Sequence, residues 1–189
     1  MRTIFSQNCL GLKTATRRTE LVAMLRRRGA FVACLQETWR VGTEELQEDG
    51  WLFVGSAPAS QHGRGRQGVG IMLSPPAAAA LDVTHDDLGA RVVAVRLLDA
   101  RDRGILLISA YAPVSTASDE DWDEYYDSLA CAIARGRAGD LVIVGTDANA
   151  SIGRGSLSGC ANDVRAGAVG PYGLDHINAS LRTPIAHLP

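Results

Sequence analysis

Leu141-Val142-Ile143-Val144-Gly145-Thr146-Asp147-Ala148-Asn149-Ala150 is the most informative segment of this 189-residue chain. Four branched apolar residues before Gly145 predict a buried strand. Asp147 and Asn149 follow at once; neither would help a core to pack, and an unpaired buried carboxylate would be costly. Because open α/β folds place ligand sites at the carboxyl ends of strands, the segment predicts a rigid strand that delivers an acid and an amide to a cleft.

Three other apolar runs end in polar residues that packing does not require, namely Asn8, Glu37 and Tyr111. A carboxylate such as Glu37 is a hard oxygen ligand suited to Mg²⁺, and the Asn8 amide adds a neutral oxygen or orients a water. Asp147 is expected to orient or deprotonate a water, while Tyr111 and Asn149 donate hydrogen bonds to a phosphate or a developing oxyanion. Metal, water and donors around a phosphate predict a hydrolytic site.

Each residue also has a plainer interpretation when it is taken alone. Glu37 is then a solvated acid after a strand, and Asn8 is a turn residue. Tyr111 buries its ring and forms a local hydrogen bond, and Asp147 with Asn149 forms an Asx turn. Only the combination of these residues favours a catalytic site.

The rest of the pattern predicts an α/β chain. Helices are expected from about Thr16 to Arg28, and from near Ser118, whose spacing to Asp121 resembles a capping box. Strands are expected at residues 3–8, 31–36, 51–54, 69–73, 92–97, 105–111 and 141–144. This order favours a sandwich of mixed sheets over a purely alternating βαβ fold.

Composition narrows the class of protein. Hydrophobic content of 46% and a net charge of −2 fit one globular domain and show no basic excess of the kind that many nucleic-acid binders carry. No apolar run is long enough to span a bilayer, and the start does not resemble a signal peptide, so no membrane association and an intracellular location are expected. The four scattered cysteines suggest reduced thiols and no zinc site. Nearly all basic residues are arginine, which reflects either genome composition or phosphate contact.

Ordered motifs reveal a family resemblance. The chain resembles the endonuclease/exonuclease/phosphatase family, whose members are metal-dependent phosphodiesterases. It most resembles the endonuclease domains of non-LTR retrotransposons. The matching stretches, in the family's order, are Ser6-Gln7-Asn8-Cys9-Leu10-Gly11-Leu12, Leu35-Gln36-Glu37-Thr38-Trp39, Gly68-Val69-Gly70-Ile71-Met72, Ser109-Ala110-Tyr111-Ala112-Pro113, Gly145-Thr146-Asp147-Ala148-Asn149-Ala150 and Gly170-Pro171-Tyr172-Gly173 with Asn178.

The resemblance implies a four-layer α/β sandwich of two mixed sheets with outer helices, formed by residues 1–189 as one domain. It implies Mg²⁺, or alternatively Mn²⁺, held by Glu37 and Asn8, with DNA as the partner; no protein partner can be inferred. Asp147, Asn149 and Tyr111 would be catalytic, and Asn178 would bind substrate.

One departure from the family pattern leaves three functions open. The family ends in an Asp-His pair whose histidine contacts the scissile phosphate, and this sequence has no matching pair before Pro189; Asp175-His176 lies in an earlier segment. The resemblance thus predicts a domain incomplete at its C-terminus, with its final strands missing. The chain is therefore expected to be a DNA endonuclease, an inactive or impaired remnant of one, or a phosphatase acting on small or lipid phosphates.

Overall fold

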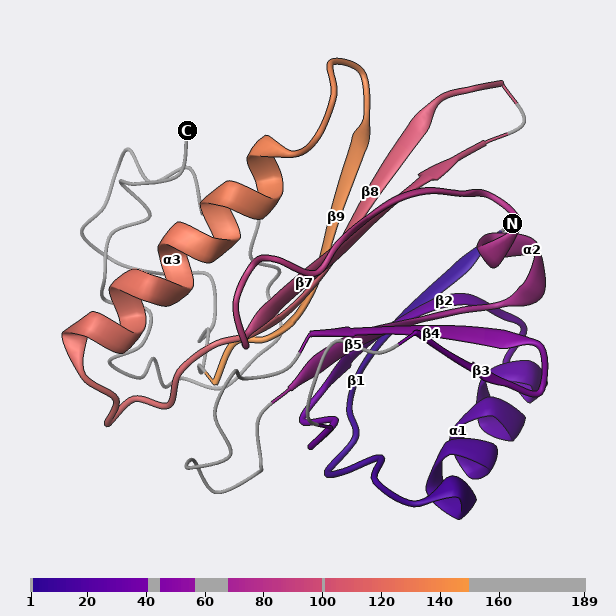
Figure 1. Cartoon of the computed structure of the whole chain (residues 1–189), viewed down its shortest axis with the longest axis horizontal. Coiled ribbons are helices and arrows are strands. Elements are labelled where there is room, and N and C mark those ends of the chain that lie inside the picture. The colour runs from indigo at the N-terminus through magenta and orange to yellow at the C-terminus, as the bar shows by residue number, and fades with distance from the viewer. Residues whose placement is uncertain (1, 41–44, 57–67, 100, 150–189) are drawn as a thin grey trace, which may run out of the picture.

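Two mixed β-sheets packed face to face form the centre of the structure (Figure 1), a computed structural model that describes residues 2–40, 45–56, 68–99 and 101–149. The first sheet has the order β1-β2-β5-β4-β3, with bounds Thr3–Asn8, Ala30–Gln36, Val69–Leu73, Trp51–Ser56 and Glu45–Glu48. The second sheet has the order β6-β7-β8-β9, with bounds Leu81–His85, Val92–Leu98, Gly104–Tyr111 and Leu141–Asp147. In each sheet one parallel pair, β1 with β2 and β8 with β9, adjoins antiparallel strands.

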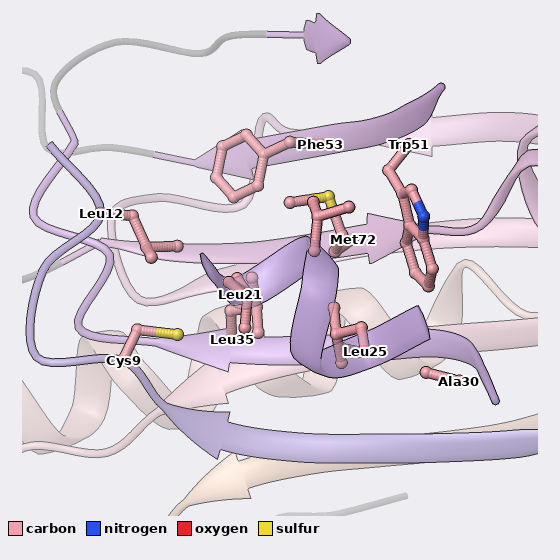
Figure 2. Close-up of a cluster of buried hydrophobic side chains, with 11 residues drawn as sticks. Cys9, Leu12, Leu21, Leu25, Ala30, Leu35, Trp51, Phe53 and Met72 are labelled. Atoms are coloured by element: carbon pink, nitrogen blue, oxygen red, sulfur yellow. The ribbon is translucent and has the colours of Figure 1, made fainter. Parts of the chain in front are cut away.

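Each sheet carries a helix on its outer face (Figure 1). Helix α1 (Ala15–Arg27) buries Leu21, Val22 and Leu25 against the first sheet, next to Trp51, Phe53 and Met72 as Figure 2 shows. Helix α3 (Asp119–Ala134) packs over β7 and β8 of the second sheet. The capping box predicted for α3 is confirmed.

A third apolar layer lies between the two sheets. Val32 and Ile71 from the first sheet and Val95 and Leu107 from the second are all almost completely buried in it. Burial of apolar side chains between the sheets and beneath both helices is the main favourable term in this fold. The predicted four-layer α/β sandwich is therefore confirmed.

The segment that begins with Leu141 forms the predicted strand, but the prediction that this strand is buried is wrong. Leu141, Val142 and Val144 are 58%, 38% and 40% exposed. The reason is the position of β9, which pairs with β8 at the edge of the described part of its sheet, while α3 lies over β7 and β8. Apolar content alone did not distinguish an edge strand from a central one.

Three short elements were not predicted from the sequence, namely β3, β6 and helix α2 (Pro75–Ala78). Pro75 begins α2 two residues after the end of β5, because proline is well tolerated in the first turn of a helix. No helix within the described ranges is long and apolar enough to cross a membrane. The predicted loss of final strands concerns residues after Asn149, which lie outside the described residues.

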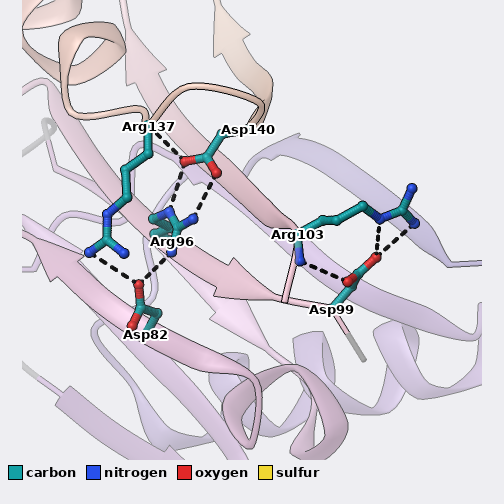
Figure 3. Close-up of polar contacts among 6 residues, drawn as sticks. All are labelled: Asp82, Arg96, Asp99, Arg103, Arg137 and Asp140. Carbon is teal, nitrogen blue, oxygen red and sulfur yellow. Dashed lines mark hydrogen bonds and ion pairs between the residues drawn. The ribbon is translucent and has the colours of Figure 1, made fainter. Parts of the chain in front are cut away.

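An ion cluster joins three strands of the second sheet at the end remote from Tyr111 and Asp147 (Figure 3). Arg96 on β7 donates to both oxygens of Asp140, just before β9, at 2.7 and 2.8 Å, and to Asp82 on β6 at 2.6 Å. The side chains of Arg96 and Asp140 are only 6% and 3% exposed. We call these three residues the arginine clamp.

Candidate active site

Strand pairing brings the predicted site residues to one end of the sandwich. The β1–β2 register places Asn8 beside Gln36, directly before Glu37, and the β8–β9 register places Tyr111 beside Asp147. Because both pairs are parallel, their carboxyl ends lie at the same edge of each sheet. Two residues thus come from each of the two facing sheets. Together with Asn149 they are called the strand-end cluster.

Hydrogen bonds join the strand-end cluster across the two sheets. The Asn8 amide nitrogen donates to Glu37 Oε1 at 2.8 Å and to Asp147 Oδ2 at 2.9 Å. The Tyr111 hydroxyl donates to the same Glu37 oxygen at 3.0 Å. The Asn8 oxygen accepts from the Leu10 backbone N–H at 3.1 Å. In this arrangement Asn8 holds two carboxylates together through its nitrogen and keeps its oxygen toward its own loop.

Asp147 and Asn149 form the Asx turn that was the plainer alternative, and Asp147 also belongs to the cluster. The Asn149 backbone N–H donates to Asp147 Oδ1 at 3.1 Å, while Oδ2 faces Asn8. The Asn149 side chain donates to the Ala112 carbonyl at 2.7 Å. Both side chains are therefore held in place by local bonds, so the turn and the cluster do not exclude each other.

Glu37 lies on a backbone that is unusual for a residue with a side chain, with φ of 51°. Such left-handed conformations persist where the surroundings over-determine them, and they gather at functional sites. Here the Glu37 carbonyl accepts from Gly11 N at 2.8 Å, and Thr38 N donates to the Gly68 carbonyl at 2.9 Å. Gly68 has φ of 104°, and a Cβ there would lie 2.7 Å from Thr38 Oγ1, so glycine is required. The glycine-led third motif thus supports the loop that presents Glu37.

The donor set fits a hard divalent cation. Two carboxylates, Glu37 and Asp147, lie within hydrogen-bonding distance of one Asn8 nitrogen. Mg²⁺ is typically bound through one or two carboxylates together with waters and substrate phosphate, rather than in an all-protein cage. Within the described ranges, no group of three or more His, Cys, Asp or Glu residues is placed to hold a metal. The two carboxylates therefore suit an open site for a hard divalent cation.

Burial raises the pKa of Tyr111. A hydrogen bond with Asn149 acts in the opposite direction, whereas the hydrogen bond to Glu37 raises the pKa further. The phenol is consequently protonated at neutral pH and donates its proton toward Glu37. Burial likewise raises the pKa of both the Cys9 and Cys34 thiols to about 12, so these buried cysteines are poor nucleophiles and poor metal ligands.

Tyr111→Phe is expected to lower the turnover of the proposed reaction by about 10- to 100-fold with little change in thermal stability. The variant keeps the ring and removes only the hydroxyl that orients Glu37, and loss of an outer contact of this kind has effects of that size at metal sites. Single-turnover rates and thermal melts would measure both quantities. Tyr126→Phe, on α3, is the matched control and should retain the wild-type rate; an unchanged rate in Tyr111→Phe would contradict the role of the hydroxyl.

Two residues near the site were not singled out by sequence reasoning. Gln36 is buried beneath the cluster and touches both sheets. Its signal was a polar residue at the end of an otherwise apolar strand. Arg91 lies over the Tyr111 ring, 5.8 Å from its centroid, and nothing in its own sequence neighbourhood suggested this contact. The predicted residue Asn178, the four-residue stretch 170–173 and three of the four histidines lie outside the described residues.

Comparison with known families identifies the group to which these motifs belong. The sequence profile of the endonuclease/exonuclease/phosphatase family matches residues 5–177. The chain belongs to this family. The match covers the segments that hold Asn8, Glu37, Tyr111 and Asp147, and it ends one residue before Asn178. A comparison with curated protein sequences finds no match.

Solved structures share the fold. The endonuclease domain of TRAS1, a telomere-specific non-LTR retrotransposon, is 24% identical with a TM-score of 0.54, over 87% of this family member and 66% of that domain. The Xenopus laevis APE2 catalytic domain is 20% identical with a TM-score of 0.54, over 86% and 63%. The AP endonuclease LMAP from Leishmania major is 18% identical with a TM-score of 0.53, over 78% and 55%. The chain thus spans less than two thirds of the length of these structures.

Proposed function

We propose that this chain hydrolyses phosphodiester bonds in DNA with the help of Mg²⁺, as an endonuclease of the retrotransposon type. The observation that carries the proposal is the hydrogen-bonded set in which Asn8 joins Glu37 to Asp147 across the two sheets. Glu37 lies on strained backbone and Asp147 lies on the strand at the edge of the described part of its sheet, and placing their two carboxylates together lowers the stability of the fold. Their pairing therefore indicates a binding function rather than a packing function. Mn²⁺ has similar preferences for oxygen ligands and is expected to substitute for Mg²⁺.

Each residue of the strand-end cluster has a distinct role in this proposal. Glu37, oriented by Asn8 and Tyr111, binds the cation together with Asp147. Asn8 was predicted as the second ligand, but its oxygen accepts from Leu10 N and its nitrogen holds the two carboxylates, so here it positions the ligands. When bound, the cation supplies positive charge next to a phosphate oxygen. Asp147 also orients the attacking water and accepts its proton. Asn149 donates a hydrogen bond toward the phosphate as charge develops on it, and Tyr111 does the same when its hydroxyl turns from Glu37 to the bound substrate. Asn178 completes the proposed set as a contact to substrate.

Basic side chains beside the cluster support a nucleic-acid substrate over a small phosphate. Lys13 and Arg17 are exposed in and after the loop that follows Asn8. Arg17 donates to the Leu10 carbonyl at 3.4 Å, which places its guanidinium at the backbone of the loop two residues after Asn8. Contacts between cationic side chains and phosphates account for much of the affinity of proteins for DNA. These two exposed cations lie near the strand-end cluster although the chain as a whole has no basic excess.

Chelation of the metal provides the direct test. Supercoiled plasmid incubated with the full chain and Mg²⁺ is expected to become open circular, and EDTA should abolish this conversion, because the two carboxylates alone supply no positive charge to the phosphate. Gel electrophoresis measures the products. Added Mg²⁺ in excess over EDTA should restore nicking.

The same preparation incubated with lipid phosphates and small phosphate monoesters distinguishes the phosphatase alternative. An endonuclease should release no inorganic phosphate from them. Release of phosphate without nicking would favour the phosphatase, and plasmid cleavage that persists in EDTA would refute the metal-dependent mechanism.

A further inference from the structure

One buried amide lies directly beneath the strand-end cluster. Gln36 is 1% exposed, and its Nε2 lies 3.3 Å from Ser6 Oγ, 3.4 Å from Ser109 Oγ and 3.2 Å from the Gly145 carbonyl. Ser109 Oγ in turn donates to the Leu35 carbonyl at 3.1 Å. The contacts therefore join β1 and β2 of the first sheet to β8 and β9 of the second.

Each partner of the Gln36 amide lies two residues before a site residue on the same strand. Ser6 precedes Asn8 by two residues, Ser109 precedes Tyr111 by two, and Gly145 precedes Asp147 by two, while Gln36 adjoins Glu37. Because side chains alternate along a strand, residues two apart lie on the same face. The strands that carry Asn8, Tyr111 and Asp147 thus each contact the Gln36 amide two residues before the site residue.

Packing does not require a polar group at this point. Elsewhere the space between the sheets is filled by apolar side chains such as Val32, Val95 and Leu107. A buried amide costs free energy unless its hydrogen bonds are made. The sheets also approach closely here, since a Cβ at Gly145 would lie 2.5 Å from Cys34 Cβ and 3.2 Å from Ser6 Oγ. Small residues and one long amide therefore set the separation of the sheets next to the site.

We propose that Gln36 is a positioning residue that fixes the pair Asn8 and Glu37 relative to the pair Tyr111 and Asp147, and thereby sets the affinity for the divalent cation. The inference rests on the proposed function for the identity of the cation. Gln36 touches neither the cation nor the substrate. It acts through the spacing of the two strand pairs, which the two cross-sheet hydrogen bonds of the cluster need to span.

Two variants separate positioning from stability. Gln36→Met keeps the volume but removes the amide, and it leaves the Ser6 and Ser109 hydroxyls without this partner. The triple variant Gln36→Met, Ser6→Ala and Ser109→Ala removes all three polar groups, and replacing a whole buried polar set by apolar groups is often nearly neutral for stability. Val95→Ala, in the same apolar layer but away from the amide, is the control for general destabilisation.

The measurements are the melting temperature, the dissociation constant of Mn²⁺ by titration calorimetry on the metal-free chain, and kcat and KM for plasmid nicking. Gln36→Met is expected to melt earlier and to bind Mn²⁺ about 10- to 100-fold more weakly, as for loss of outer contacts at metal sites. The triple variant should regain most of the melting temperature, while Mn²⁺ affinity and kcat stay low and KM is unchanged. Val95→Ala should retain the affinity.

Two results would overturn the inference. One is recovery of Mn²⁺ affinity in the triple variant together with its melting temperature, and the other is an equal loss of affinity in Val95→Ala. Binding is measured without turnover, so wild-type protein that binds Mn²⁺ but does not nick DNA would refute the proposed function and still test this inference. Wild-type protein that binds no Mn²⁺ would overturn both.

Discussion

Glu37→Gln is expected to lower the rate of Mg²⁺-dependent plasmid nicking by on the order of 10³-fold, because a bound cation supplies several kcal/mol of charge stabilisation in reactions of this kind. The variant has nearly the same shape, and glutamine still offers an oxygen to the Asn8 amide and the Tyr111 hydroxyl. What it loses is the negative charge that attracts the cation. Initial nicking rates over a range of Mg²⁺ concentrations measure the effect. Part of the lost rate should return at high Mg²⁺ if weakened binding is the cause.

The melting temperature is a second, independent measurement of the effect of Glu37→Gln. Two carboxylates held together by one amide repel each other when no cation is present, so Glu37→Gln should melt at the same temperature as wild-type protein in EDTA, or at a higher one. Mg²⁺ should stabilise the wild-type protein and have little effect on the variant. Glu20→Gln, an exposed acid on α1, is the isosteric control and should match wild type throughout. A Glu37→Gln protein that nicks at the wild-type rate would remove Glu37 from the mechanism.

Arg96→Met is expected to lower the melting temperature by on the order of 10 °C, since removing one partner of a buried ion cluster leaves carboxylates buried and unpaired. Arg96 satisfies both oxygens of Asp140 and one of Asp82. The arginine clamp lies at the opposite end of the second sheet from Asp147, so nicking by the folded protein below its melting transition should be nearly unchanged. Thermal melts followed by circular dichroism measure the loss.

The neighbouring pair of Arg103 and Asp99 supplies the matched control (Figure 3). Arg103 is 69% exposed, and exposed ion pairs contribute little to stability. Arg103→Met should therefore melt close to wild type. Gly104→Ala is a second test of the arginine clamp. A Cβ at residue 104 would lie 1.8 Å from Asp140 Oδ1 and would displace the Asp140 carboxylate. Equal melting temperatures for Arg96→Met and Arg103→Met would show that the clamp does not stabilise the fold.

The pH dependence of the clamp follows from Asp140. Hydrogen bonds from Arg96 lower the pKa of this carboxyl from 3.8 to about 2. A depressed folded-state pKa contributes stability above the unfolded pKa, and this contribution is lost as the pH falls through the folded value. The difference in melting temperature between wild type and Arg96→Met should thus be full above about pH 4 and shrink toward pH 2. A difference that stays constant over this range would exclude Asp140 as the cause.

Regular elements were predictable where local chemistry decides them. The Ser118 capping box sets the start of α3, and the apolar run predicted as a strand at residues 105–111 lies within β8. The exposure of Leu141 and Val144 was not predictable, because it depends on which strand lies at the edge and on where α3 packs. Short elements such as α2 were missed because four residues carry no measurable periodicity.

The family and the residue types that carry its chemistry could be predicted from the order of residues, because an acid, an amide or a tyrosine directly after an apolar run is a local feature of the chain. How these residues come into contact depends on the packing of the two sheets. Asn8 and Asp147 are 139 residues apart, and only two facing sheets bring the amide to 2.9 Å from the carboxylate. Gln36 is a second example. In the sequence it is only the last residue of a predicted strand, but in the fold its amide contacts both sheets. Hydrogen bonds between distant strands depend on register and sheet packing, which no local pattern specifies.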